Sequence, residues 1–270
     1  MPLVAAFLVP GSPLPYLRRD NPPWTPLVAA HEVAARALAA AAPDVLLVYS
    51  TQWFAVLDQL WQTRAHIAGL HVDENWYEYG DLPFDLRIDT AVAAACIAGT
   101  AAFGVRSKGV DYDGFPIDTG TIVANGFLNP HSHAKLVIAA NNLYHDWAMT
   151  ERLAALAAQS AEALGRRYAV IGIGGLSGTI FREEIPLATD HIARPADDEL
   201  NRALLAKLAS GNLEEVRAFG LDYAAQARAD MGLKHLAWIL GALGSRFTGA
   251  TTLGYGPTYG SGAAVVQFNV

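Results

Sequence analysis

Short segments rich in branched aliphatic residues alternate along this chain with longer segments rich in alanine and leucine. The short segments have the length of buried strands, and most lack a strict apolar–polar alternation, which is typical of a sheet covered on both faces. The alternation therefore predicts an α/β fold, a single domain over residues 1–270 with a central mixed sheet flanked by helices on both faces. The predicted strands are residues 3–9, 45–49, 117–123, 136–140, 168–171 and 264–268.

Capping residues indicate where the helices begin and end. Thr25 followed by Pro26 is an N-cap with proline at the first helical position, and Asp89 is a second N-cap candidate. Gly165 marks the end of a helix that we expect to open at Thr150. The predicted helices are 25–42, 91–103, 151–164, 198–209, 213–219 and 223–243, and the segments 73–86 and 254–262 are predicted as ordered loops of the kind that often line sites.

The composition excludes several classes of protein. Hydrophobic residues make up 52% of the chain and charged residues only 17%, with a net charge of -7, whereas an average soluble domain is about 25% charged. Intrinsic disorder needs the opposite balance, and nucleic-acid binding needs a basic stripe. No apolar run approaches the roughly 20 residues of a membrane-spanning helix. The apolar excess is what a permanent subunit interface would require.

The cysteine content and the N-terminus bear on the compartment. Cys96 is the single cysteine, so the chain cannot form an internal disulfide, which fits a reducing compartment. The first ten residues contain no basic segment and end at Pro10, so they indicate a first strand rather than a signal peptide. We expect a cytoplasmic protein.

The glycine-rich segment from Gly172 to Gly178 follows a predicted strand. It departs from a dinucleotide-binding fingerprint, because Ser177 stands at the third glycine position. It also fails as a nucleophile elbow, because Thr179 stands where a glycine is needed two residues after the serine. We interpret it as a tight turn that leaves the sheet.

His131 and His133 are the one closely spaced histidine pair, and two such imidazoles on one face of a strand would suit a metal. No carboxylate stands in an obvious relation to them as a third ligand, so we favour a loop held by imidazole hydrogen bonds. His31 and His66 are interpreted as structural or surface residues, and the role of Lys234-His235 stays open. An aromatic cluster could stack on a ligand or fill the core or an interface: Trp53, Phe54, Trp61, Trp76, Tyr77 and Tyr79.

Five short motifs occur in an order and at a spacing that resemble the class III extradiol ring-cleaving dioxygenases of the protocatechuate 4,5-dioxygenase type. The resemblance covers nearly the whole chain. The motifs are Pro10-Gly11-Ser12-Pro13, Gln52 before Trp53, Asp118-Thr119-Gly120-Thr121, Gly174-Gly175-Leu176-Ser177-Gly178, and Lys234 ahead of Trp238 and Gly241-Ala242-Leu243.

The chemical residue of each motif is replaced. Members of the family hold Fe(II) with two histidines and a glutamate, and the resemblance places Gly11, Gln52 and Lys234 at those positions. Thr119 and Gly178 stand where members carry a substrate-facing histidine and the proposed acid/base histidine. Glycine offers no ligand, and a lysine ammonium would repel a metal cation. The resemblance thus implies a vestigial pocket, with no catalytic residue and no metal ligand in this chain.

A heteromeric branch of the family, which opens an aminophenol ring with O2, pairs a metal-free α subunit with a homologous iron-bearing β subunit in an α2β2 assembly. The resemblance implies that this chain is such an α subunit, with a stabilising role, no cofactor of its own and Fe(II) in its partner. Two alternatives remain. The chain could be a divergent metalloenzyme that uses His131 and His133, or a stand-alone binding or scaffold protein on the same fold.

Overall fold

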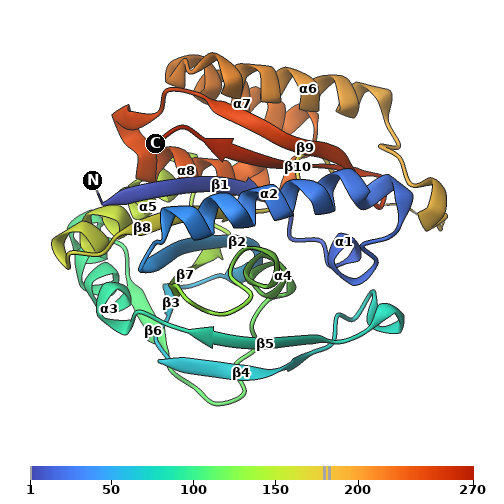
Figure 1. Ribbon diagram of the computed structural model, residues 1–270. Coiled ribbons are helices and arrows are strands. Elements are labelled where there is room, and N and C mark those ends of the chain that lie inside the picture. Colours follow the sequence, from blue (N-terminus) through green and yellow to red (C-terminus); the bar gives the residue numbers. More distant parts are fainter. Residues whose placement is uncertain (1, 179–180, 182–183) are drawn as a thin grey trace.

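The computed structural model describes residues 2–178, 181 and 184–270 (Figure 1). An eight-stranded sheet lies at its centre, with the strand order β6-β3-β7-β2-β8-β1-β10-β9. The strands are β1 Leu3–Val9, β2 Val45–Ala55, β3 Gln59–Gln62, β6 Ser107–Val110, β7 Lys135–Asn142, β8 Tyr168–Ile173, β9 Ala250–Thr258 and β10 Ser261–Phe268. The three central pairings, β7-β2, β2-β8 and β8-β1, are parallel, whereas β10 runs antiparallel to β1, so the sheet is mixed as predicted.

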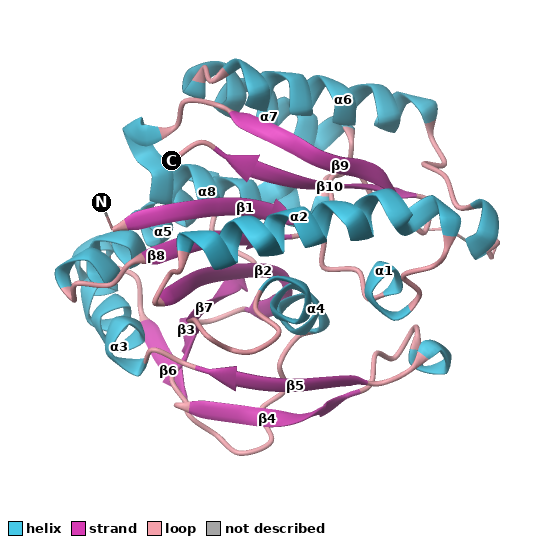
Figure 2. Cartoon of the chain, viewed as in Figure 1, coloured by secondary structure: helices cyan, strands magenta, loops and turns pink. Residues whose placement is uncertain are grey.

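Helices cover both faces of this sheet, which confirms the predicted fold class. Figure 2 shows α2 and α4 on the near face and α5 and α8 behind the sheet. The strand β8 is buried along its whole length, because apolar side chains meet helices on either side. The helices are α1 Leu14–Leu17, α2 Thr25–Ala41, α3 Thr90–Gly99, α4 Thr119–Leu128, α5 Trp147–Ala163, α6 Pro195–Ser210, α7 Leu213–Gln226 and α8 Lys234–Leu243.

Side-chain caps fix several of the helix starts. The Asp89 carboxylate accepts a hydrogen bond from the Val92 N–H at 3.2 Å, as its position in the sequence suggested. The helix expected to open at Thr150 begins one turn earlier, at Trp147, because the Asp146 carboxylate caps the Met149 N–H at 2.8 Å. The Thr150 hydroxyl instead donates to the Asp146 carbonyl oxygen.

The predicted strand at 117–123 is wrong, because most of that segment lies in helix α4. Asp118 caps α4 by accepting from the Thr121 N–H at 2.9 Å. The helix is buried on nearly all sides over residues 119–124, so its sequence shows no amphipathic period. A short apolar run of this kind cannot be assigned to strand or helix by periodicity alone.

The segment 254–262 is also not a loop, because it belongs to the hairpin of β9 and β10. Tyr259 and Gly260 form its two-residue turn, and both have left-handed backbone angles, with φ of 50° and 74°. Gly254 lies where α2 crosses the hairpin, since a Cβ there would sit 2.8 Å from the Pro26 carbonyl oxygen. The glycines that suggested a loop therefore allow close packing of a helix on a strand.

A two-stranded arm stands apart from the main sheet and replaces part of the predicted loop 73–86. It consists of β4 (His66–His71) and β5 (Leu82–Arg87), joined through a helical turn at Tyr77–Tyr79. The predicted helix 223–243 is divided, because α7 ends at Gln226 and α8 starts at Lys234. Three consecutive residues between them, 231–233, have positive φ values that no helix can contain. Among the described residues, no helix is both long and apolar enough to cross a membrane.

Candidate functional site

A cleft of about 1140 Å³ opens at the carboxyl ends of β1, β2 and β8, next to the amino end of α4. In open α/β sheets this edge is where ligands bind. Four of the five positions that the sequence motifs singled out line the cleft, namely Gly11, Gln52, Thr119 and Gly178. The arm contributes His71 and Asp73 from the opposite wall.

The Gln52 side chain ties two walls of the cleft together. Gln52 lies in the irregular stretch of β2 between Ser50 and Phe54, where the pairing with β7 shifts register. Its Nε2 atom donates to the Gly11 carbonyl oxygen at 3.3 Å, and its Oε1 atom accepts from the Gly120 N–H at 2.7 Å. Both polar atoms of the amide are therefore engaged with backbone groups of the protein.

Gly11 has almost no free space around it. A Cβ atom at this position would lie 3.1 Å from Gln52 Nε2, 3.1 Å from Gly120 Cα and 3.1 Å from Ile173 Cγ2. Any larger side chain would have to displace the Gln52 amide and the start of α4. The packing thus accommodates glycine at position 11. A residue with a longer side chain would fit only if its neighbours rearranged.

Thr119 links the arm to the body of the protein. Its hydroxyl donates to Asp73 Oδ2 at 2.9 Å, and its oxygen lies 2.8 Å from His71 Nε2. Because the hydroxyl has one hydrogen, His71 Nε2 is the donor in the second bond. The other oxygen of Asp73 accepts from the N–H groups of Asn75 and Trp76, so both carboxylate oxygens are hydrogen-bonded.

No signal in the sequence marks His71 as a residue of the cleft. The strand β4 that carries His71 is six residues long and largely exposed, so it has no apolar pattern to mark it. Asp73 lies in the segment predicted as a site-lining loop, and that expectation is confirmed for its side chain.

Lys234 is turned away from the cleft. It is the first residue of α8, and its Nζ donates to the Asn142 carbonyl oxygen at 2.9 Å and to Asn141 Oδ1 at 3.2 Å. Burial lowers the pKa of Lys234 from its ordinary value. The ammonium therefore anchors the carboxyl end of β7.

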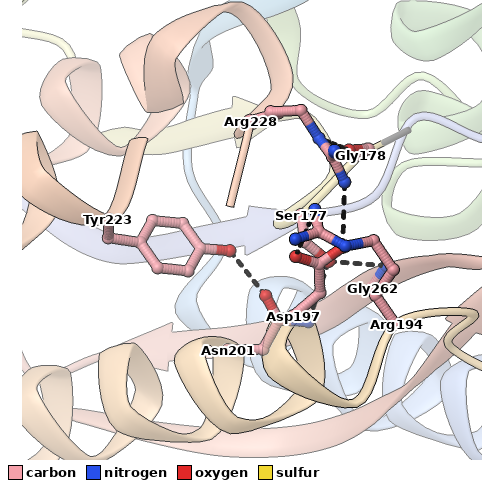
Figure 3. Close-up of polar contacts among 8 residues, drawn as sticks. All are labelled: Ser177, Gly178, Arg194, Asp197, Asn201, Tyr223, Arg228 and Gly262. Carbon is pink, nitrogen blue, oxygen red and sulfur yellow. Dashed lines mark hydrogen bonds and ion pairs between the residues drawn. The ribbon is translucent and has the colours of Figure 1, made fainter. Parts of the chain in front are cut away.

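Gly178 ends the glycine-rich turn that leaves β8, as the sequence analysis proposed for this segment. Its carbonyl oxygen accepts a hydrogen bond from Arg228 Nε at 2.9 Å (Figure 3). The guanidinium also pairs with Asp197 at 3.3 Å, and Arg194 pairs with the other oxygen of Asp197. An arginine and a buried carboxylate thus hold this turn against the start of α6.

Ser177 is held by a second part of the same network (Figure 3). Its hydroxyl oxygen accepts from Asn201 Nδ2 at 3.0 Å and from the Gly262 N–H at 3.2 Å, and Tyr223 donates to Asn201 Oδ1 at 2.6 Å. None of these partners is a base, so the network positions the turn and does not activate the hydroxyl.

His131 and His133 lie far from this arrangement in the fold. They occupy an exposed loop at the amino end of β7, the opposite edge of the sheet from the cleft, with ring centroids 5.6 Å apart. We expected the imidazoles to hold this loop by hydrogen bonds, but Ser132 and Asn129 hold it instead. The Ser132 hydroxyl donates to the Asp85 carbonyl oxygen, and the Asn129 side chain bonds the N–H and the carbonyl oxygen of Ala134.

The other histidines serve packing or surface contacts. His31 is buried, stacks on Phe127 at 4.1 Å and donates through Nδ1 to the Leu27 carbonyl oxygen. His66 is exposed beside Asp85. His235 is fully buried behind the cleft, and burial lowers its pKa to about 4. Its ring fills the space next to Gly174, where a Cβ would lie 2.7 Å from Nδ1.

The aromatic cluster divides between the cleft and the rest of the fold. Trp53, Phe54 and Trp76 line the cleft, and Trp76 meets Tyr259 edge-to-face at 4.7 Å. Trp61 belongs to the buried core instead. The cleft therefore keeps aromatic walls.

The residues of the cleft do not fit an Fe(II) ion. Gly11 has no side-chain donor atom, and both polar atoms of the Gln52 amide are engaged. Lys234 lies outside the cleft, with its ammonium bonded to Asn141 and Asn142. Asp118 and Asp230 are committed as well, the first to Ser50 and the cap of α4 and the second to Thr51 and the Gly175 N–H. Within the described ranges, no three His, Cys, Asp or Glu side chains come together in a way that could hold a metal.

The family model described as the catalytic LigB subunit of aromatic ring-opening dioxygenase matches residues 7–266, and the chain belongs to this family. It is 50% identical to the 2-aminophenol 1,6-dioxygenase alpha subunit of a Pseudomonas species, over 100% of both chains. The resemblance drawn from the five motifs is thereby confirmed.

Two further relatives extend the comparison. The beta subunit of the Pseudomonas 2-aminophenol 1,6-dioxygenase is 26% identical, over 99% of this chain and 94% of its own length. The crystal structure of an uncharacterized protein from Escherichia coli K12 has a TM-score of 0.66 at 13% identity, covering 98% of this chain and 100% of that one. The latter similarity concerns the fold alone.

Proposed function

We propose that this chain is the metal-free, non-catalytic α subunit of a heteromeric 2-aminophenol 1,6-dioxygenase in the cytoplasm. The complex would add both atoms of O2 to 2-aminophenol and break the ring bond next to the hydroxyl-bearing carbon, which gives 2-aminomuconic semialdehyde. Fe(II) and the residues that act on the substrate would belong to a homologous β subunit. The full-length identity of 50% to an α subunit supports the assignment to this enzyme.

The observation that best supports a metal-free, non-catalytic chain is the position of the Gln52 amide. It is hydrogen-bonded to the Gly11 carbonyl oxygen on one side and to the Gly120 N–H on the other. These hydrogen bonds use the two polar atoms that could approach an ion between β1 and β2. Neutral amides are also weaker ligands for Fe(II) than the imidazole and carboxylate of the usual facial triad. Without a metal, the cleft has no Lewis acid to bind an aromatic substrate and O2 together.

The proposed role is to stabilise the β subunit. Large apolar side chains are exposed on this chain at several places, Leu57 and Tyr144 among them. Contact of such side chains with water is unfavourable in a monomer. A permanent interface would cover such surface. The segments around the cleft are joined by many hydrogen bonds, so this chain can offer the β subunit a rigid surface.

The direct test is to express this chain alone and together with the β-type chain of the same organism. We expect the isolated chain to contain substoichiometric iron and to show no O2 uptake with 2-aminophenol. The co-expressed complex should bind iron and consume one O2 per substrate. Stoichiometric iron and full ring cleavage by the isolated chain would overturn the proposal.

A further inference from the structure

An apolar patch lies at the carboxyl ends of β2 and β7, just outside the cleft. We define this β2–β7 patch by the side chains Phe54, Val56, Leu57, Leu143 and Tyr144, all of which are exposed. Leu57 is 83% exposed and Tyr144 is 79% exposed, which is far from the usual environment of such residues. Phe54 also lines the cleft, so the patch and the mouth of the cleft form one continuous surface.

The backbone beneath the β2–β7 patch is rigidly held. The Leu143 N–H donates to the Ala55 carbonyl oxygen at 2.9 Å, which joins the β7–α5 loop to the end of β2. Asn142 donates through Nδ2 to the Asp58 carbonyl oxygen, and Lys234 donates to the Asn142 carbonyl oxygen from the other side. Two loops that are remote in sequence thus present their apolar side chains on one fixed frame. Such a preorganised surface loses little conformational freedom when it binds.

A charged rim borders the patch. Asp58 follows Leu57 and pairs with Arg106 Nε at 2.6 Å and with Lys108 Nζ at 2.8 Å. Both basic side chains are largely exposed, and together they leave one uncompensated positive charge. An apolar centre with a polar rim is the usual anatomy of a protein–protein interface. The complementary surface would carry apolar side chains with acidic groups on its border.

We propose that the β2–β7 patch is the surface on which this chain binds the iron-bearing β subunit. The inference rests on the proposed function. The β subunit is the proposed partner because the relatives of this chain include both an alpha and a beta subunit of 2-aminophenol 1,6-dioxygenase. Each is similar to this chain over nearly its full length. Docking there would also cover the mouth of the cleft, since Phe54 belongs to both.

The test uses two single substitutions, Leu57→Asp and Tyr144→Asp, with Leu221→Asp as the matched control. Leu221 is an exposed leucine on α7, at 56% exposure, outside the patch. Each variant of the full chain is mixed with the β-type chain of the same organism, and the dissociation constant is measured by light scattering and titration calorimetry. The thermal midpoint of each isolated variant is recorded to show that it folds.

Both patch variants should weaken binding roughly thirtyfold or more, as the loss of a central anchor does. Leu221→Asp should bind like the unchanged chain, and all three midpoints should stay close to that of the unchanged chain. If the unchanged chain assembles and both patch variants assemble equally tightly, the surface assignment is wrong and the proposed function stands. If the patch variants abolish only a self-association of this chain, a second copy is the occupant and the assignment is again overturned. If the unchanged chain does not assemble at all, the proposed function fails and the assignment fails with it.

Discussion

Gln52 Nε2 lies 3.3 Å from the carbonyl oxygen of Gly11, and this contact joins the ends of β1 and β2 in the wall of the cleft. The glutamine amide is neutral and satisfies both backbone groups that it reaches. This part of the cleft is therefore a hydrogen-bonded wall built from Gln52, Gly11 and Gly120.

The packing around Gly11 predicts that Gly11→Ala is destabilising. The new Cβ would have three neighbours at 3.1 Å, and one of them is the backbone of Gly120, which cannot move freely. We expect a loss of about 1–3 kcal/mol in the free energy of unfolding, measured by urea titration. Gly175→Ala is the matched control, because its Cβ would meet nothing closer than 3.7 Å. Equal stability of the two variants would contradict the tight packing at Gly11.

Thr119→Val should loosen the arm. Valine has the same shape but lacks the hydroxyl that joins His71 to Asp73. Because each of these groups then loses one hydrogen-bond partner, we expect the free energy of unfolding to fall by about 1–3 kcal/mol. Hydrogen exchange of the amides in residues 66–87 should accelerate, whereas exchange in β8 should not change. Thr251→Val, on the exposed side of β9, serves as the control. Unchanged protection of the arm would show that the Thr119 bonds do not hold it.

Two buried histidines predict that stability falls in mild acid. Burial lowers the pKa of His31 and of His235 to about 4, from an ordinary value of 6.5, and Asp230 only partly offsets the effect at His235. The unfolded chain therefore binds protons first as the pH falls. The stability from the neutral rings is complete above about pH 6.5 and is lost towards pH 4, by at most about 3 kcal/mol for each ring.

The measurement is urea unfolding at several values between pH 7.5 and 4. His31→Leu and His235→Leu should each flatten the decline of the unfolding free energy with falling pH, whatever they do to stability at pH 7.5. A decline that is equally steep in both variants would assign the acid sensitivity to other groups.

His131 and His133 should be dispensable. Both are exposed at the amino end of β7, so replacing both with alanine should leave the stability within about 0.5 kcal/mol of the unchanged chain. The metal content and the turnover of the complex, measured by mass spectrometry and O2 uptake, should not change. A loss of metal from the double variant would revive the alternative of a metalloenzyme centred on this pair.

The sequence motifs locate the cleft well because they sit where the fold brings chain segments together. Gly11 follows β1, Gly178 follows β8 and Thr119 starts α4, and parallel strands necessarily place such positions at one edge. The orientation of Lys234 could not be predicted, because it depends on the left-handed backbone of residues 231–233 that sets the start of α8. No periodicity in the sequence records that break.

The misassigned elements have a common cause. Burial on nearly all sides removes from α4 the period that distinguishes helix from strand, and the close approach of α2 requires the glycine in β9 that suggested a loop. The strands β3 and β6 are short and β4 is largely exposed, so the sequence does not predict them or the place of His71. The part of the site contributed by the arm was thus visible only in the structure.

Anomalous X-ray scattering at the iron absorption edge, from crystals of this chain with its β-type partner, tests the central claim most directly. We predict one strong anomalous peak for each pair of subunits, located in the β chain. We predict no peak in the cleft of this chain, with the Gln52 amide bonded to Gly11 and Gly120. An iron peak between Gly11, Gln52 and Lys234 would contradict the account.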